Sequence, residues 1–174
     1  MSGAVPAGPV CQQPGESLSA LALLSTNWRP DQKEVALREE AARQGLDGFF
    51  ASADCFASVE TRRLPGAASA VAPTDEELLS IAAMARAKPD RVLLVTVREL
   101  GPVVKVFGSA ALLEGGTEVV LDLRALDMRS GAPLASFQTH WQNGGAMVIK
   151  GVASLPQDMS AALREALRPR PAAR

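Results

Sequence analysis

The segment EVVLDLRALDMRSGAPLASFQTHWQ, residues 118–142, predicts two paired strands and decides the class of fold. Its first part, 118–127, alternates between apolar and polar side chains, as a strand with one buried face does. The residues DMRSGAP at 127–133 are typical of a tight turn. The stretch 134–142 alternates again, so we expect it to return as an antiparallel partner of the first strand.

The residues before this hairpin predict strands that alternate with helices. The second of these helices opens with the capping box Thr74-Asp75-Glu76-Glu77, and Gly101-Pro102 predicts a bulge in the strand that follows it. We expect Phe49-Phe50 to lie in the connection after the first helix. The predicted elements are a buried strand at 18–25, a helix from Pro30 to a stop at Gly45, an edge strand at 58–64, a helix at 74–88 and a β-branched strand at 91–106.

After the hairpin, Ser154-Leu155-Pro156-Gln157 reads as a second capping box and predicts a last helix, with Met159, Leu163 and Leu167 on its apolar face. The order β-α-β-α-β-β-β-α predicts an α/β (α+β) fold in which helices pack on a mixed sheet. Its first two crossovers give parallel strands, and its last three strands form a meander. We expect a flexible lead-in at 1–16, a single domain at 17–168 and a disordered tail at 169–174.

The composition is that of one globular domain, with 174 residues, 47% hydrophobic and 21% charged. The net charge of −1 provides no basic field, and the chain has no Tyr, so we expect no nucleic-acid partner. No apolar run approaches the roughly 20 residues that span a bilayer. Residues 1–10 lack the pattern of an export signal, which indicates either a cytosolic protein or a chain whose signal has been removed.

Catalytic and cofactor motifs are not found in the sequence. The single histidine, His140, shares a strand face with Ser136, Gln138 and Gln142, so we expect it to face solvent. There is no GxSxG, GxGxxG or GxxxxGK[ST] pattern, and we interpret Gly115-Gly116 and Gly144-Gly145 as turns. We therefore expect no catalytic residues, no metal site and no cofactor.

The two cysteines, Cys11 and Cys55, precede the first and second predicted strands. If those strands are parallel neighbours, both thiols lie at the same edge of the sheet, where a disulfide can form. A bridge would indicate maturation in an oxidising compartment. The alternative is two unpaired cysteines, one in a loose lead-in and one half-buried.

Three predicted loops converge at the other end of the sheet and carry large apolar side chains. They are 27–29, 107–116 and 141–151, and they form what we call the Trp-rich rim. Apolar residues on loops indicate either a binding surface or loops that fold down to complete the core. The predicted rim residues are Trp28, Arg29, Phe107, Leu112, Leu113, Trp141, Met147 and Ile149.

Four stretches between 17 and 168 resemble one group of small bacterial envelope proteins. They are LALLS, AKPDRVLLVTV, LDLRALDMRSGAPLASF and LPQDMSAALREAL. In order and pattern they are similar to the TolB amino-terminal and CsgG-like group, which includes LpoB- and PelC-like lipoproteins. The resemblance implies a non-enzymatic module for assembly or secretion in the periplasm or at the outer membrane. Group members usually begin with a lipidated cysteine after a signal, which gives peripheral membrane association; this chain shows no such signal.

We therefore expect a non-catalytic interaction module that contacts a protein partner or a second copy through the Trp-rich rim. One alternative is a small-ligand-binding domain with a pocket under the two glycine doublets. Another is an enzyme of unfamiliar type, which would need His140 in a cleft beside a carboxylate.

Overall fold

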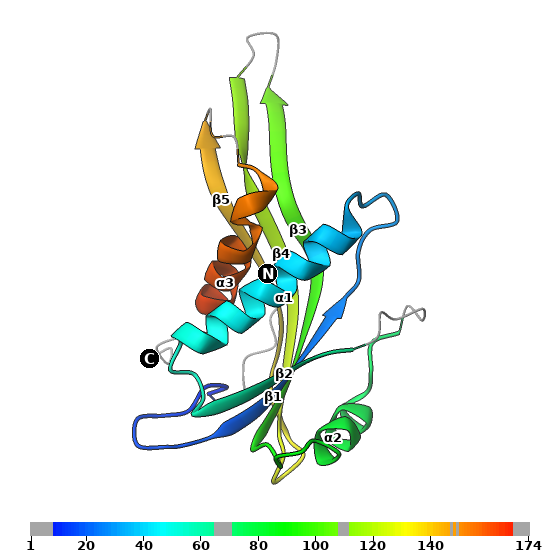
Figure 1. Ribbon diagram of the computed structural model, residues 1–174, viewed down its shortest axis with the longest axis vertical. Coiled ribbons are helices and arrows are strands. Elements are labelled where there is room, and N and C mark those ends of the chain that lie inside the picture. Colours follow the sequence, from blue (N-terminus) through cyan, green and yellow to red (C-terminus); the bar gives the residue numbers. More distant parts are fainter. Residues whose placement is uncertain (1–8, 65–70, 108–111, 147, 149, 169–174) are drawn as a thin grey trace.

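A five-stranded mixed sheet forms the centre of the computed structural model, which describes residues 9–64, 71–107, 112–146, 148 and 150–168 (Figure 1). The sheet has the order β2-β1-β3-β4-β5, which confirms the predicted class of fold. A short 3-10 turn, Val152–Ser154, precedes the last helix. The strands are β1 Ser19–Thr26, β2 Ser58–Arg63, β3 Arg91–Phe107, β4 Leu112–Asp127 and β5 Pro133–Ala146, and the helices are α1 Val35–Ser52, α2 Asp75–Ala83 and α3 Leu155–Ala166.

The pairing of the strands follows the predicted pattern. β1 runs parallel to β2, with Ser19 opposite Ser58, and parallel to β3 on its other side. β3, β4 and β5 form an antiparallel meander. The turn between β4 and β5 is closed by Asp127, whose carboxylate accepts from the amide of Ser130 at 3.0 Å, and by Gly131 at φ 71°. The expectation that the first two strands lie side by side is confirmed.

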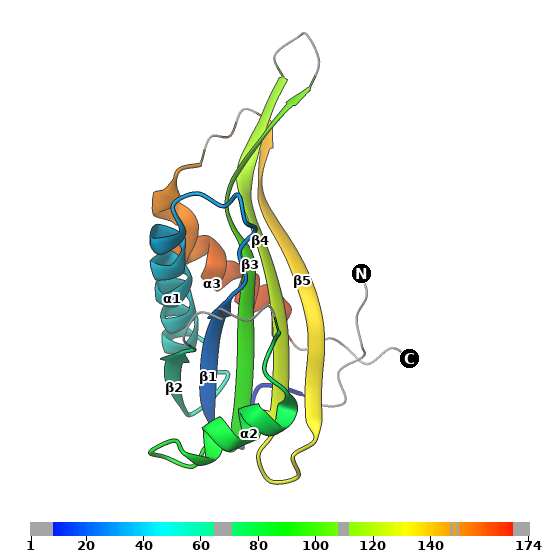
Figure 2. The same cartoon turned by 90° about the vertical axis from the view of Figure 1, so that its right-hand side faces the viewer.

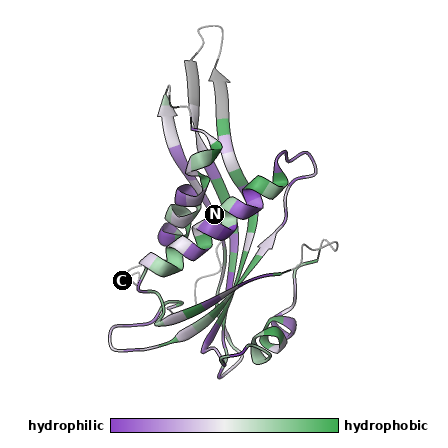
Figure 3. Cartoon of the chain, viewed as in Figure 1, coloured by the Kyte–Doolittle hydropathy of each residue, from purple (hydrophilic) through white to green (hydrophobic). Residues whose placement is uncertain are grey.

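Helices cover both faces of the sheet, but unequally. α1 and α3 pack on one face over the larger core cluster, whereas α2 covers the other face only near the β4–β5 turn (Figure 2). β1 is therefore buried on both sides: Leu21 and Leu23 lie toward α2, and Leu24 lies toward α1. This double burial explains its continuous apolar sequence. The outward side of α1 carries hydrophilic residues (Figure 3).

The first helix differs from the prediction at both ends. It begins at Val35 rather than Pro30, after Glu34 in the left-handed region at φ 54°, and it continues through Gly45 to Ser52. Gly45 does not stop the helix because it packs against α3, where a Cβ would lie 2.5 Å from Met159 Cβ. Phe49 and Phe50 therefore belong to α1 rather than to a connection.

Of the two predicted capping boxes, one is present and the other is not. The capping box of Thr74 and Glu77 is present, although α2 ends at Ala83 instead of continuing to residue 88. The second predicted capping box is wrong, because the Ser154 hydroxyl donates to Asp158 at 2.9 Å instead of accepting from the helix backbone. The predicted apolar face of α3 is nevertheless buried at Met159 and Leu163.

The strands of the meander are longer than predicted. β3 reaches Phe107 and β4 begins at Leu112, so most of the predicted loop 107–116 is strand. The glycine doublets are not turns: they face each other across β4 and β5, with Gly115 opposite Gly145 and Gly116 opposite Gly144. The register shift in β3 lies between Val97 and Glu99 rather than at Gly101-Pro102.

A disulfide joins Cys11 to Cys55, with 4.5 Å between their Cα atoms. The amide of Gln12 donates to the carbonyl of Cys55 at 2.9 Å, and Val10 is buried in the larger core cluster. The bridge therefore fixes the residues before β1 to the segment before β2, and of the two alternatives that the sequence left open the disulfide is the one present. A crosslink over 44 residues stabilises a fold by about 4 kcal/mol in the chain-entropy description.

Candidate interaction surface

The meander extends beyond the rest of the sheet. β1 pairs with β3 only as far as Val97, so the strand residues after that level form a three-stranded extension, which we call the arm. It projects past the helices in Figure 1. The arm consists of Glu99–Phe107, Leu112–Val120 and His140–Ala146.

The two tryptophans lie at the base of the arm. Trp28 follows β1, where the amide of Asn27 donates to the carbonyl of Val97 at 2.9 Å. Trp141 stands in β5 opposite Val119, so it is on a strand and not on a loop as predicted. Both side chains are half-buried and pack against the core cluster beneath α1 and α3. The structure thus brings both tryptophans to the same face of the sheet.

The indole nitrogen of Trp28 is buried and has no hydrogen-bond partner among the residues that the structure describes. A buried donor without an acceptor costs about 1–3 kcal/mol. The indole N–H is a donor only, so the side chain is satisfied only by an acceptor brought next to it. Of the two tryptophans, Trp28 is therefore the one with an unsatisfied buried donor.

Charged side chains lie along the neighbouring edge of β3, and one of them, Arg38, was not identified from the sequence. Arg38 of α1 is buried and donates to the carbonyl of Leu100 and, at 2.8 Å, to the carbonyl of Lys33. Gly101 leaves the space for its guanidinium, because a Cβ there would overlap Arg38. The predicted rim residue Arg29 is exposed and forms an ion pair with Glu99 at 3.3 Å.

The remaining predicted rim residues do not lie on described loops. Phe107 ends β3, and Leu112 and Leu113 begin β4, so these three belong to strands of the arm, and their side chains lie outside the described part. Met147 and Ile149 fall outside the described residues altogether. Of the eight predicted residues, only Trp28, Arg29 and Trp141 can be placed with their side chains.

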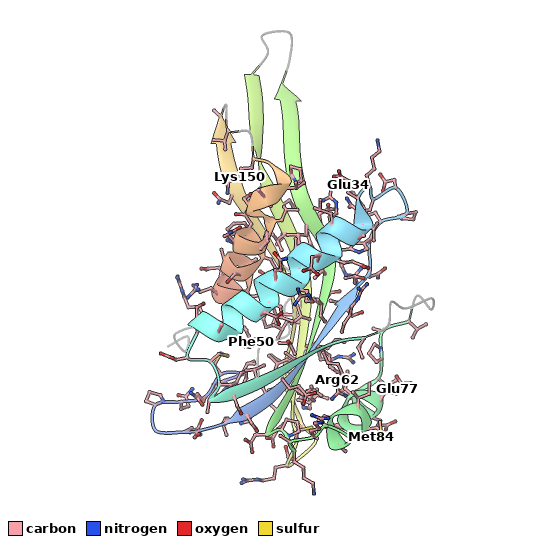
Figure 4. All side chains as sticks on the ribbon, in the orientation of Figure 1. Glu34, Phe50, Arg62, Glu77, Met84 and Lys150 are labelled. Atoms are coloured by element: carbon pink, nitrogen blue, oxygen red, sulfur yellow. A yellow bond between two sulfur atoms is a disulfide. The ribbon has the colours of Figure 1, made fainter. Side chains whose placement is uncertain are left out.

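A buried polar cluster links the arm to α3. Asp158, in the first turn of α3, has a side chain that is only 5% exposed. It accepts from Ser154 at 2.9 Å, from Lys150 at 3.1 Å and from Asn143 of β5 at 3.3 Å, and Lys150 is seen beside the start of α3 in Figure 4. Burial by itself would raise the pKa of Asp158, but these hydrogen bonds outweigh it and hold the pKa below its usual value.

A groove of about 760 Å³ lies at the opposite end of the sheet, beside α2 and the β4–β5 turn. The alternative of a pocket under glycine-rich loops is wrong in its premise, because the doublets are paired strands. In the groove the backbone amide of Ser19 donates to Asp90 at 2.8 Å and lowers the pKa of that carboxyl. The Ser130 hydroxyl lowers the pKa of Asp127, which also pairs with Arg91. These groups fix the start of β1 and the turn.

His140 stands on the face of the sheet that the helices of the larger core do not cover. Its side chain is 53% exposed and its Nε2 contacts the Glu118 carboxylate, with Gln142 at 3.2 Å. The carboxylate partner that an enzyme would need is present, but the pair lies on an open strand face. Within the described ranges, no group of three or more His, Cys, Asp or Glu side chains is arranged to hold a metal.

The chain is similar to known proteins only in the arrangement of its backbone. No protein-family model matches the chain, and no curated protein matches it. Solved structures with a similar arrangement include bacterial lipoproteins. None of the helices in the described part is long and apolar enough to cross a membrane.

Three of these structures cover most of the chain. The lipoprotein GNA1162 from Neisseria meningitidis is 18% identical with a TM-score of 0.47, covering 86% of this chain and 97% of that one. The hypothetical protein CT253 from Chlamydia trachomatis is 15% identical with a TM-score of 0.45, covering 86% and 93%. The PelC dodecamer from Paraburkholderia phytofirmans is 14% identical with a TM-score of 0.44, covering 84% and 86%. All three TM-scores are below 0.5, so the proposals below rest on the residues of this chain.

Proposed function

We propose that this chain is a non-catalytic interaction module of the bacterial cell envelope. Its contact surface is the helix-side base of the arm, where Trp28 and Trp141 lie, and it binds a protein partner or a second copy there. The observation that carries the proposal is the position of the tryptophans: the only two in the chain share one face of the sheet, and both remain partly exposed. Tryptophan is among the side chains most enriched at the energetic centres of protein interfaces.

The disulfide supports the envelope as the compartment. Disulfides persist in oxidising compartments such as the periplasm and are rare in a reducing cytosol. Cys11 and Cys55 are bridged, and the structure contains no free cysteine among its described residues. The four stretches of sequence that resemble small envelope lipoproteins favour the same compartment. A lipid anchor on a preceding segment would hold such a module at the outer membrane.

The surface can be tested by removing both tryptophans. The Trp28→Ser/Trp141→Ser double variant is expected to lose at least tenfold in affinity for its partner or for a second copy. In-cell crosslinking and sedimentation velocity, with circular dichroism as the check on folding, measure the change. A matched control is Phe50→Ser, because Phe50 is also a half-buried aromatic packed on the same core cluster but lies at the far end of α1 (Figure 4).

The two variants separate a contact surface from a general loss of packing. The proposal requires that association falls in the tryptophan variant and persists in Phe50→Ser. A folded tryptophan variant with unchanged crosslinks and unchanged sedimentation would show that the contact surface lies elsewhere.

A further inference from the structure

The two edges of the sheet are protected to different degrees. β2, one edge, is a strand of six residues that includes Glu60, Arg62 and Arg63, and Arg62 is visible on it in Figure 4. Short length and charged side chains are the usual means by which an edge strand avoids pairing with another chain. The β2 edge is therefore closed to strand addition.

β5, the other edge, lacks this protection. It is a strand of 14 residues, PLASFQTHWQNGGA, without a single Asp, Glu, Lys or Arg. Its only irregularities are Pro133 and the register shift beside it, both at the turn. Among the described residues, β4 is the only strand paired with β5, and no backbone bond reaches residues 134–144 from another segment. A row of unpaired backbone donors and acceptors thus runs along its outer side.

The side chains of β5 are arranged symmetrically about Thr139. Phe137 and Trp141 stand two residues to either side of it, both half-buried and both on the helix-covered face. If two β5 strands pair antiparallel with Thr139 opposite Thr139, each Phe137 faces a Trp141 of the other copy. Aromatic pairs across antiparallel strands contribute roughly 0.2–1 kcal/mol each. On the opposite face the same register places Gln138 beside His140, a polar pair.

We infer that β5 pairs with β5 of a second copy of this chain, antiparallel and centred on Thr139, so that one sheet continues through a two-fold dimer. The absence of charge favours a second copy as the occupant, because an uncharged strand meets no like charge when it faces itself. Residues 135–143 of one copy lie opposite 143–135 of the other. The inference rests on the proposed function, since it specifies the partner for the surface that contains Trp141.

Introduced cysteines can test the register, because the described part of the chain contains no free thiol that would compete. In Thr139→Cys the two new thiols lie opposite each other, within the reach of about 7 Å that a disulfide between Cα atoms needs. In Ser136→Cys and in Gln142→Cys each new thiol is six positions from its own counterpart, about 20 Å along the strand. Ser136 of one copy, however, faces Gln142 of the other.

The expected results follow from that geometry. The unmodified protein sediments as a dimer at micromolar concentration, and mild oxidation converts most of Thr139→Cys to a crosslinked dimer. Ser136→Cys and Gln142→Cys, oxidised separately, stay uncrosslinked, whereas an equimolar mixture of the two forms the mixed dimer. The mixture of Ser136→Cys and Gln142→Cys remains informative if the change at the half-buried Thr139 disturbs folding.

Other outcomes overturn the inference in distinguishable ways. A protein that stays monomeric, with no crosslink in any variant or in the mixture, excludes a second copy and leaves a strand of another protein as the occupant of the β5 edge. The tryptophan variants then still decide the proposed function. A dimer that Trp28→Ser abolishes but that gives no crosslink at Thr139 keeps the proposed surface and excludes the β5 edge. Crosslinking of Ser136→Cys alone, as efficient as that of Thr139→Cys, excludes the register.

Discussion

The base of the sheet and the arm are the same three strands, β3, β4 and β5, in two different surroundings. At the base β3 lies beside β1, and side chains on both of its faces belong to core clusters, so Leu93 and Leu94 on adjacent positions are both buried. In the arm β1 has ended and α2 is absent, and the β4–β5 pair contains two glycine doublets. Apolar burial stabilises the base, whereas the arm combines backbone pairing and a few polar contacts with apolar burial at Leu100 and Val119.

The region that stabilises the fold is thus different from the region that is free to contact another molecule. The faces of a strand that is buried on both sides are not accessible to another molecule. The role of the apolar base is therefore to stabilise the fold. In the arm, the edge strand β5 is exposed at His140, at 142–144 and at Ala146. The arm contains Trp141 and residues 140–143 of the proposed strand edge, and the remaining residues of that edge, 135–139, pair with β4 at the base.

Removal of the disulfide tests the base and has the largest expected effect. The Cys11→Ser/Cys55→Ser variant should unfold with a free energy lower by about 4 kcal/mol, because the unfolded chain regains the entropy that the crosslink removed. Chemical denaturation followed by tryptophan fluorescence measures the loss. The bridge precedes β1 and β2, neither of which pairs with β5 at the opposite edge of the sheet, so the dimer of any folded fraction should persist. An unchanged denaturation midpoint would show that the bridge contributes nothing to the base.

A methyl group on Gly144 tests the arm and comes next in size. A Cβ there would overlap the carbonyl oxygen of Gly115 on β4, so the two strands must separate. We expect Gly144→Ala to cost about 3 kcal/mol, as overpacking against a fixed backbone does. The control is Gly48→Ala in α1, where a Cβ meets nothing within 4 Å; it should be neutral or stabilise by up to about 1 kcal/mol. Equal stabilities of the two variants would contradict the close approach of β4 and β5.

The base was largely predictable from the sequence, and the arm was not. Element order, the neighbourhood of β1 and β2, the Asp127 turn and the bridge of Cys11 follow from local patterns and from the rules of strand connection. A glycine doublet looks like a turn locally, and only the register of β4 with β5 reveals that it permits close approach. Gly45 is a similar case, because its neighbour Met159 is far away in the sequence. A close contact that a glycine permits with a residue far away in the sequence cannot be predicted from the residues next to that glycine.

The same limit applies to the polar residues of the site. Asp158 stands in the first turn of a predicted helix, where the helix dipole already accounts for an acid. Its contact with Asn143 depends on how α3 lies against β5, and the buried Arg38 depends on where β1 ends. For both, the signal in the sequence is only a charged residue close to an apolar stripe.

The smallest expected effect concerns the link between the two regions. Asp158→Asn keeps the shape of the side chain but removes the charge that pairs with Lys150 and accepts from Ser154, and it should cost about 2 kcal/mol, as the loss of hydrogen bonds to a charged group does. The pKa of Asp158 is lowered in the folded protein, so its contribution is complete above the ordinary aspartate pKa of about 4 and disappears as the pH falls through the lower folded value. Denaturation at pH 7 and at about pH 2.5 should therefore show a large difference between variant and parent at pH 7 and a smaller one in acid.

A second carboxylate shows whether this pH dependence comes from the buried link. Hydrogen bonds from Arg43 and Gln44 lower the pKa of Glu40 to about 2, but Glu40 lies in solvent on α1. Surface ion pairs contribute little, so Glu40→Gln should leave the stability nearly unchanged at either pH. If the two substitutions had equal effects, the arm would not be attached through Asp158. A loss at pH 7 confined to Asp158→Asn, with a shorter-lived dimer in the same variant, would show that α3 holds the arm in the position in which β5 can pair.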